Sequence, residues 1–242
     1  MMDRRAVLVD LPDEVIVNVF RYIGLTELLT KTNRVCRWFY KIIKYSPTLW
    51  TSIDFENPVC INTKEQLNYL LYHSIKFQTF LFGYTSLNVE VFDIDLLFTC
   101  QLSKAISLYW LDLSRCRLST LCFVKRLSNL KIINLSECQN LVNEDFKVLT
   151  TCTNLDQVYV SFTQIKADTV VELGSVLKLM VLDVCGVQLS IENCETILQH
   201  SYRTLLFLHI SILGPDIDEE SVNTRLIDVY IDTSIKVQRF LN

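Results

Sequence analysis

A repeated pattern of apolar residues sets the strongest limit on how this chain can fold. In each repeat, apolar side chains occupy the first, fourth and sixth positions of a short segment, and a serine or cysteine follows. The first positions of successive segments lie 22 to 26 residues apart. The alternation at the end of each segment predicts a strand with one buried face. The five clearest segments are Leu108/Leu111/Leu113, Leu130/Ile133/Leu135, Leu155/Val158/Val160, Leu179/Leu182/Val184 and Leu205/Leu208/Ile210.

The segments between these strands carry helical signals. Thr63 to Gln66 form a capping box that opens a helix. Residues 143–151 and 166–173 place apolar side chains at helical spacing, and Ser190 can cap a helix that ends near His200. We therefore expect each unit to contain one strand and one helix.

A strand and a helix repeating every roughly 20–29 residues resemble a leucine-rich repeat. Weaker segments that begin at Trp50, Phe77 and Leu226 extend the pattern toward both ends of the chain. The alternative is a set of coincidental amphipathic strands in an ordinary α/β domain. The resemblance predicts an α/β solenoid over residues 51–242, with a curved parallel sheet and outer helices.

Residues 8–50 form a smaller unit that carries more apolar bulk than three short helices can hide. One stripe, Val15, Ile16, Val19, Phe20 and Ile23, is wide enough to meet two surfaces. A segment of about 40 residues seldom supports its own core without help, so we infer a docking module. The predicted helices run from Pro12 to Gly24, from a Thr26 cap through Glu27 to Lys31, and from Arg34 to Tyr45 before Pro47.

Several residues of this unit follow a known family pattern. They are Leu11-Pro12, Phe20, Leu28-Leu29, Val35-Cys36-Arg37 and Leu49-Trp50. The unit resembles the F-box, although the aromatic residue three places after Cys36 is Phe39, with Trp38 one place early. The whole chain therefore resembles an F-box/leucine-rich-repeat protein, a substrate-receptor subunit of an SCF-type ubiquitin ligase.

The resemblance implies two kinds of partner. The F-box would bind a Skp-type adaptor and, through it, a cullin-RING ligase. The repeats would hold a protein substrate for ubiquitination. The predicted adaptor contacts are Leu11, Pro12, Ile16, Phe20, Leu28, Leu29, Val35, Cys36, Leu49 and Trp50. The alternative for each of them is a place in the core of the unit or packing against the first repeat.

The predicted substrate surface is the concave side of the sheet, formed by residues that alternate with the buried strand positions. Its apolar and aromatic side chains, flanked by acids, suit a target with apolar anchors and Lys or Arg. The alternative is that loops cover the aromatic residues. The site residues are Trp110, Asp112, Ile132, Asn134, Tyr159, Asp183, Phe207, His209 and Tyr230, and the same column contains Asp54, Gln157, Val181, Asp228 and Asp232.

Composition narrows the function further. A net charge of −4 gives no support to nucleic-acid binding, and no apolar run is long enough to span a membrane. Nine scattered cysteines and the lack of an apolar leader favour a protein that is cytoplasmic or nuclear and not secreted.

Motifs for catalysis are missing from the sequence. No glycine spacing fits a phosphate loop, no Cys-x-x-Cys pair occurs, and the three histidines lack a nucleophile partner. We therefore expect no enzyme, no cofactor and no metal. Two other possibilities stay open: an adaptor-binding scaffold that directs no ubiquitin transfer, and a repeat protein that binds no adaptor.

Overall fold

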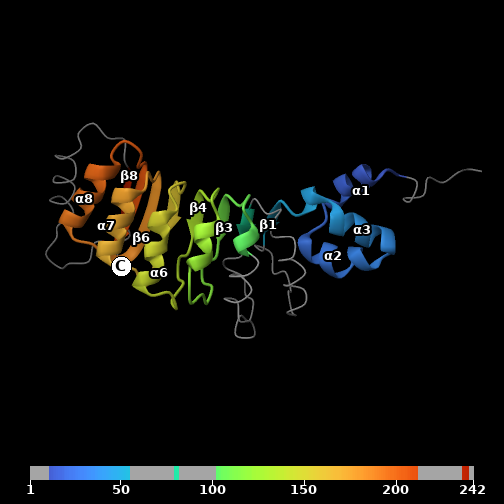
Figure 1. The fold of residues 1–242 in the computed structure, drawn as a ribbon, viewed down its shortest axis with the longest axis horizontal. Helices are drawn as coiled ribbons and strands as arrows, with labels where there is room; N and C mark the ends of the chain where they lie inside the picture. The colour runs from blue at the N-terminus through green and yellow to red at the C-terminus, as the bar shows by residue number, and fades with distance from the viewer. Residues whose placement is uncertain (1–10, 55–78, 82–101, 212–235, 240–242) are drawn as a thin grey trace, which may run out of the picture.

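The computed structural model describes residues 11–54, 79–81, 102–211 and 236–239. Short helices form a unit at the N-terminal end, and a long parallel sheet with helices on one side continues from it (Figure 1). This is the predicted architecture, a small helical unit followed by a sheet-and-helix solenoid.

Three α-helices and two short 3-10 helices make up the N-terminal unit. Pro12 caps the first helix, and its carbonyl accepts from the Ile16 backbone N–H at 3.3 Å. The second helix begins after Gly24, one residue before the predicted Thr26 cap. The elements are α1 (Asp13–Phe20), α2 (Leu25–Thr30), η2 (Thr32–Arg34), α3 (Arg37–Tyr45) and η3 (Pro47–Leu49).

The first and third helices are shorter than predicted. The first ends at Phe20 rather than Gly24, because Gly24 lies at the start of α2. The third begins at Arg37 rather than Arg34, since Cys36 lies in extended backbone and its Sγ accepts from the Phe39 N–H at 3.4 Å. A cysteine cap of this kind is not among the usual N-cap residues, so sequence preferences did not place the start of the helix.

Within the described residues, eight parallel strands pair in sequence order to form one sheet. All five strong segments are confirmed as strands, and so are the two weaker segments after Trp50 and Phe77. The Leu226 segment and the Thr63 capping box lie outside the described residues, and the strand paired with β7 begins at Lys236. The strands are β1 (Ser52–Asp54), β2 (Thr79–Leu81), β3 (Trp110–Asp112), β4 (Ile132–Asn134), β5 (Gln157–Tyr159), β6 (Val181–Gln188), β7 (Phe207–Ser211) and β8 (Lys236–Arg239).

The helical segments between the strands confirm the predicted alternation. Ser190 caps the last of them, accepting from the Asn193 N–H at 3.2 Å while the Asn193 side chain accepts from the Ser190 N–H at 3.1 Å. Figure 1 shows α6, α7 and α8 on the same side of the sheet. The segments are η6 (Leu102–Lys104), η7 (Cys122–Arg126), α6 (Asn143–Phe146), η8 (Lys147–Thr151), α7 (Ala167–Val176) and α8 (Ile191–Ser201).

One apolar side chain of each strand from β3 to β7 is fully buried, and these are Leu111, Ile133, Val158, Leu182 and Leu208. Asparagine side chains form hydrogen bonds between neighbouring repeats. Asn129 Nδ2 donates to the Ile106 carbonyl at 2.8 Å, and Asn154 Nδ2 donates to the Ser128 carbonyl at 2.6 Å. The buried apolar residues of the helical unit and of the repeats form one continuous cluster, so the two parts share a core.

Gly174 lets α7 and α8 approach closely. A Cβ at this position would lie 2.8 Å from Ile197 Cγ2 and 3.3 Å from Ile197 Cβ. Ile197 is fully buried. Overpacking at such a site costs about 1–3 kcal/mol, which offsets the gain in helix propensity of about 1 kcal/mol.

We therefore expect Gly174→Ala to lower the free energy of unfolding by about 1 kcal/mol, measured by urea denaturation. The exposed residue Glu172 on the same helix gives the control, because Glu172→Ala should change stability by less than about 0.5 kcal/mol. Adding Ile197→Ala should make the Gly174→Ala change less costly. Strict additivity of the two changes would show that the helices do not meet at this point.

Candidate functional site

One side of α1 is apolar and exposed, although the opposite side of the same helix is buried. Ile16 and Phe20 point into the core of the helical unit. Val15 is 41% exposed and Val19 is 48% exposed. We call the exposed residues Leu11, Val15, Val19 and Tyr22 the α1 outer face. Val15 and Val19, four residues apart, lie on one side of the helix, and Leu11 and Tyr22 flank its two ends.

Contacts within the unit hold α1 in a fixed position. Trp38 Nε1 on α3 donates to Asp13 Oδ1 at 2.9 Å. The rings of Phe20 and Phe39 meet edge to face, with their centroids 5.0 Å apart. Because these contacts join α1 to α3, the α1 outer face is presented on a supported helix.

The predicted adaptor contacts fall into two groups in the structure. Leu11, Pro12, Val35 and Cys36 are exposed, and Leu49 is partly buried. The other five side chains lie in the core, where in the free chain they support the surface from below: Ile16, Phe20, Leu28, Leu29 and Trp50.

Val15, Val19 and Tyr22 were not among the predicted contacts, although the sequence contained their signal. The wide apolar stripe predicted two contact surfaces for this helix, and the structure confirms one buried and one exposed side. The stripe alone did not say which members face inward, since that depends on where α3 lies. Adaptor contact by any of these residues stays a prediction.

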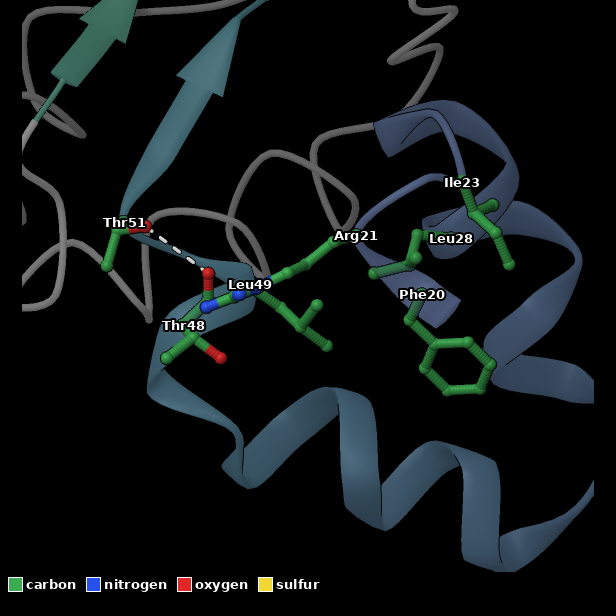
Figure 2. Close-up of a pocket in the computed structure, with 7 residues that line it drawn as sticks. All are labelled: Phe20, Arg21, Ile23, Leu28, Thr48, Leu49 and Thr51. Atoms are coloured by element: carbon green, nitrogen blue, oxygen red, sulfur yellow. Dashed lines mark hydrogen bonds between the residues drawn. The ribbon is translucent and has the colours of Figure 1, made fainter. Parts of the chain in front are cut away.

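A small pocket opens between the end of α1, the start of α2 and η3 (Figure 2). Thr51 Oγ1 donates to the Thr48 carbonyl at 3.2 Å beside it. The cavity volume is about 230 Å³, below the roughly 300–1,000 Å³ of most small-molecule sites. The described residues that line it are mostly apolar or hydroxyl-bearing, with one arginine, and its size suits one inserted side chain. Its lining residues are Phe20, Arg21, Ile23, Leu28, Thr48, Leu49 and Thr51.

The sheet side opposite the helices, which we call the open sheet face, carries two rows of side chains in register. The first row is Trp110, Ile132, Gln157, Val181 and Phe207, and the second row is Asp112, Asn134, Tyr159, Asp183 and His209. Phe207 is 38% exposed, and the other nine side chains are partly buried. Loops therefore do not bury these side chains completely.

Each acid or amide of the second row also accepts a hydrogen bond from the backbone N–H two residues later. Asp112 Oδ1 accepts from the Ser114 N–H at 2.9 Å, and Asn134 Oδ1 accepts from the Ser136 N–H at 3.0 Å. Cys185 N–H donates to Asp183 Oδ1 at 3.2 Å in the same way. These local bonds are Asx turns, and they fix the carboxylates in position.

Strand-to-strand contacts continue along the second row. Asn134 Nδ2 donates to Asp112 Oδ2 at 3.1 Å, and His209 Nδ1 lies 3.5 Å from Asp183 Oδ2. The ring of His209 also contacts that of Phe207. The sequence predicted the place of these residues on the face but not the hydrogen bonds, which depend on the strand register. Tyr230, Asp228 and Asp232 lie outside the described residues.

Turns after the strands use a left-handed backbone at equivalent places. Arg115, Glu137 and Phe162 have φ between 55° and 62°. Gly186, at the corresponding place, has φ 82° and lies at the irregularity within β6. Across two of these turns, Arg115 and Glu137 form an ion pair at 2.9 Å. The cysteine or serine before each turn was visible in the sequence, whereas the positive φ values were not.

The buried thiols are poor candidates for nucleophilic chemistry. Burial raises the pKa of Cys138 to about 12 and that of Cys194 to about 11. Burial also raises the pKa of Cys116 well above its ordinary value. A thiol must ionise to act as a nucleophile or metal ligand, so these residues serve as packing groups at neutral pH.

Within the part of the chain that the structure describes, no cluster of three or more His, Cys, Asp or Glu side chains could hold a metal ion. None of the helices described is both long and apolar enough to cross a membrane.

Comparison with known proteins agrees with both parts of the structure. Residues 8–56 match the F-box-like family model, so the helical unit is an F-box-like domain. Internalin C2 of Listeria monocytogenes is similar in structure, with a TM-score of 0.51 and 14% identity over 89% of this chain and 92% of that chain. The likeness shows the fold, a parallel sheet with helices as in leucine-rich-repeat proteins.

A leucine-rich repeat protein from Bacteroides thetaiotaomicron is also similar, with 14% identity and a TM-score of 0.34. That match covers 52% of this chain and 17% of the other. No curated protein matches the chain. An F-box-like domain suggests adaptor binding and a repeat region suggests protein interaction, and both are typically non-catalytic modules.

Proposed function

We propose that this chain is the substrate-recognition subunit of an SCF-type ubiquitin ligase. Its F-box-like domain docks on a Skp-type adaptor, and the repeats hold a protein target. The observation that carries the proposal is the α1 outer face, an exposed apolar helix surface on a domain that matches the F-box-like model. The proposed boundaries are residues 8–50 for adaptor binding and 51–242 for target binding.

The adaptor would receive α1 as a helix in a groove. This mode of recognition uses apolar anchors spaced three or four residues apart on one helix face. Val15 and Val19 have that spacing on α1, and Leu11 and Tyr22 lie just before and after the helix. The exposed Val35 is a further apolar residue, from the Val35-Cys36 pair of the F-box pattern. The buried residues beneath them act as a rigid support, because their positions are fixed by packing.

Catalysis would then require no reacting group from this chain. A target tethered near a ubiquitin-conjugating enzyme that carries ubiquitin presents its own lysines to that enzyme at a raised effective concentration. A non-catalytic role agrees with the raised pKa of the Cys116, Cys138 and Cys194 thiols, because a protonated thiol does not attack a ubiquitin thioester. The proposed location is the cytoplasm or the nucleus, where the other ligase subunits would be met, and the proposed role needs no cofactor.

Reconstitution tests the proposal. The full chain is co-purified with a Skp-type adaptor, a cullin and its RING subunit, and a target is captured with the complex by crosslinking in cell extract. Addition of ubiquitin and the activating and conjugating enzymes should modify the captured target, measured by mass spectrometry. A complex that assembles fully but transfers no ubiquitin to any captured protein would instead support the adaptor-binding scaffold and contradict the ligase role.

A further inference from the structure

The apolar side chains of the open sheet face come in two pairs. Trp110 and Ile132 are partners in register on β3 and β4, and Val181 and Phe207 are partners on β6 and β7. Gln157 on β5 separates the two pairs in the same row. The row therefore offers two apolar contact areas with a polar centre, rather than one continuous apolar band.

The distance between the two areas follows from the sheet geometry. Neighbouring strands lie about 4.8 Å apart, so three strand steps separate the pair centres by roughly 14 Å. An extended chain advances about 3.4 Å per residue and covers that distance in about four residues. Side chains alternate in an extended segment, so residues i and i+4 both point to the same side. A single extended segment that crosses the strands can therefore fill both areas.

The second row gives the face its charge. Asp112 and Asp183 are acidic, and none of the ten residues of the two rows from β3 to β7 is Lys or Arg. Lys236 on β8 is the register partner of Phe207, so the acidic part of the face lies over β3 to β6. Asx-turn bonds fix both carboxylates, so they need little rearrangement to meet a cation. Gln157 and Tyr159, joined by a hydrogen bond of 3.0 Å, place polar groups between the two acids. A second copy of this face would bring like charges together and is disfavoured.

We propose that the open sheet face binds an extended protein segment with apolar side chains at positions i and i+4 and a Lys or Arg between them or directly beside them. This inference rests on the proposed function, since it names the kind of target segment that the repeats would hold. Apolar anchors provide the contact area, and the acids select against acidic segments.

Selection from a displayed library of random peptides, about 12 residues long, tests the spacing with the full chain as bait. Enriched peptides should share two apolar residues four apart and a basic residue near them. A synthetic peptide with that pattern is then compared by fluorescence polarisation with versions spaced three or five residues apart and with Lys changed to Glu. Each altered peptide should bind at least roughly tenfold more weakly.

Variants of the chain locate the binding surface. Trp110→Ala and Phe207→Ala should each weaken binding of the peptide by roughly tenfold or more. Tyr202, an exposed aromatic residue at the end of α8, supplies the control, and Tyr202→Ala should leave binding unchanged.

Different results would overturn different statements. Absence of any enriched peptide, or enrichment with another spacing, overturns the proposed segment. If another spacing still depends on Trp110, the face binds targets and only the segment pattern is wrong. Binding that survives both Trp110→Ala and Phe207→Ala overturns the location. Ubiquitin transfer in the reconstituted complex is measured separately, so its failure is not confused with these.

Discussion

Replacing Trp50 by alanine is expected to lower the free energy of unfolding by about 3–5 kcal/mol, the usual cost of deleting a buried aromatic side chain. Trp50 is 0% exposed and is the largest of the fully buried side chains that the structure describes, at the point of the chain between η3 and β1. Its Nε1–H donates to the Ile43 carbonyl at 2.7 Å. The substitution leaves a cavity and removes a donor from a buried carbonyl, and both effects destabilise the fold.

Urea denaturation followed by circular dichroism measures this change, and Trp110→Ala provides a matched control. Both variants lose an indole, but Trp110 lies partly exposed on the open sheet face. Its loss should cost less than about 2 kcal/mol, because less apolar area leaves the interior. Equal losses for the two variants would show that the burial of Trp50 adds nothing to stability beyond that of a partly exposed tryptophan.

The second large effect is expected at the α1 outer face. The double change Val15→Asp and Val19→Asp places two charges where the adaptor groove would receive apolar side chains. Burying unpaired charge is costly, so adaptor affinity should fall at least roughly 100-fold, measured by calorimetry. Because both valines are exposed in the free chain, its free energy of unfolding should change by less than about 1 kcal/mol.

Val142 and Val176 on the repeats give a close control for this variant. They are 48% and 54% exposed and lie at the start of α6 and the end of α7. Val142→Asp with Val176→Asp should leave adaptor affinity unchanged. If this control weakens the adaptor as much as the α1 variant does, the loss comes from general destabilisation and not from a lost contact.

The sequence predicted the repeats well because their period is a local property. Buried positions such as Leu111 and Leu182 recur every 22 to 26 residues, and the structure places them on parallel strands in register. Ser190 and Asn193 likewise form the expected helix start, since both capping partners lie within four residues of each other.

Features that depend on distant residues were harder to predict. The start of α3 depends on the extended backbone at Cys36. Packing of α1 against α3 decides which side of α1 is buried and which is exposed. The apolar stripe of α1 contained all four residues and did not show that Ile16 and Phe20 are buried while Val15 and Val19 are exposed. On the open sheet face, Asp112 and Asp183 are both partly exposed and bonded to the backbone N–H two residues later. That hydrogen bond could not be predicted without the local backbone conformation.

Direct titration of the full chain with a Skp-type adaptor tests the central claim, that the exposed side of the helical unit is completed by another protein. Isothermal titration should give a one-to-one complex with a dissociation constant below about 1 µM, and the heat capacity should fall on binding because apolar surface becomes buried. Size-exclusion chromatography should show the two chains eluting together. A chain that stays monomeric and monodisperse, releases no heat and elutes apart from the adaptor would contradict the claim.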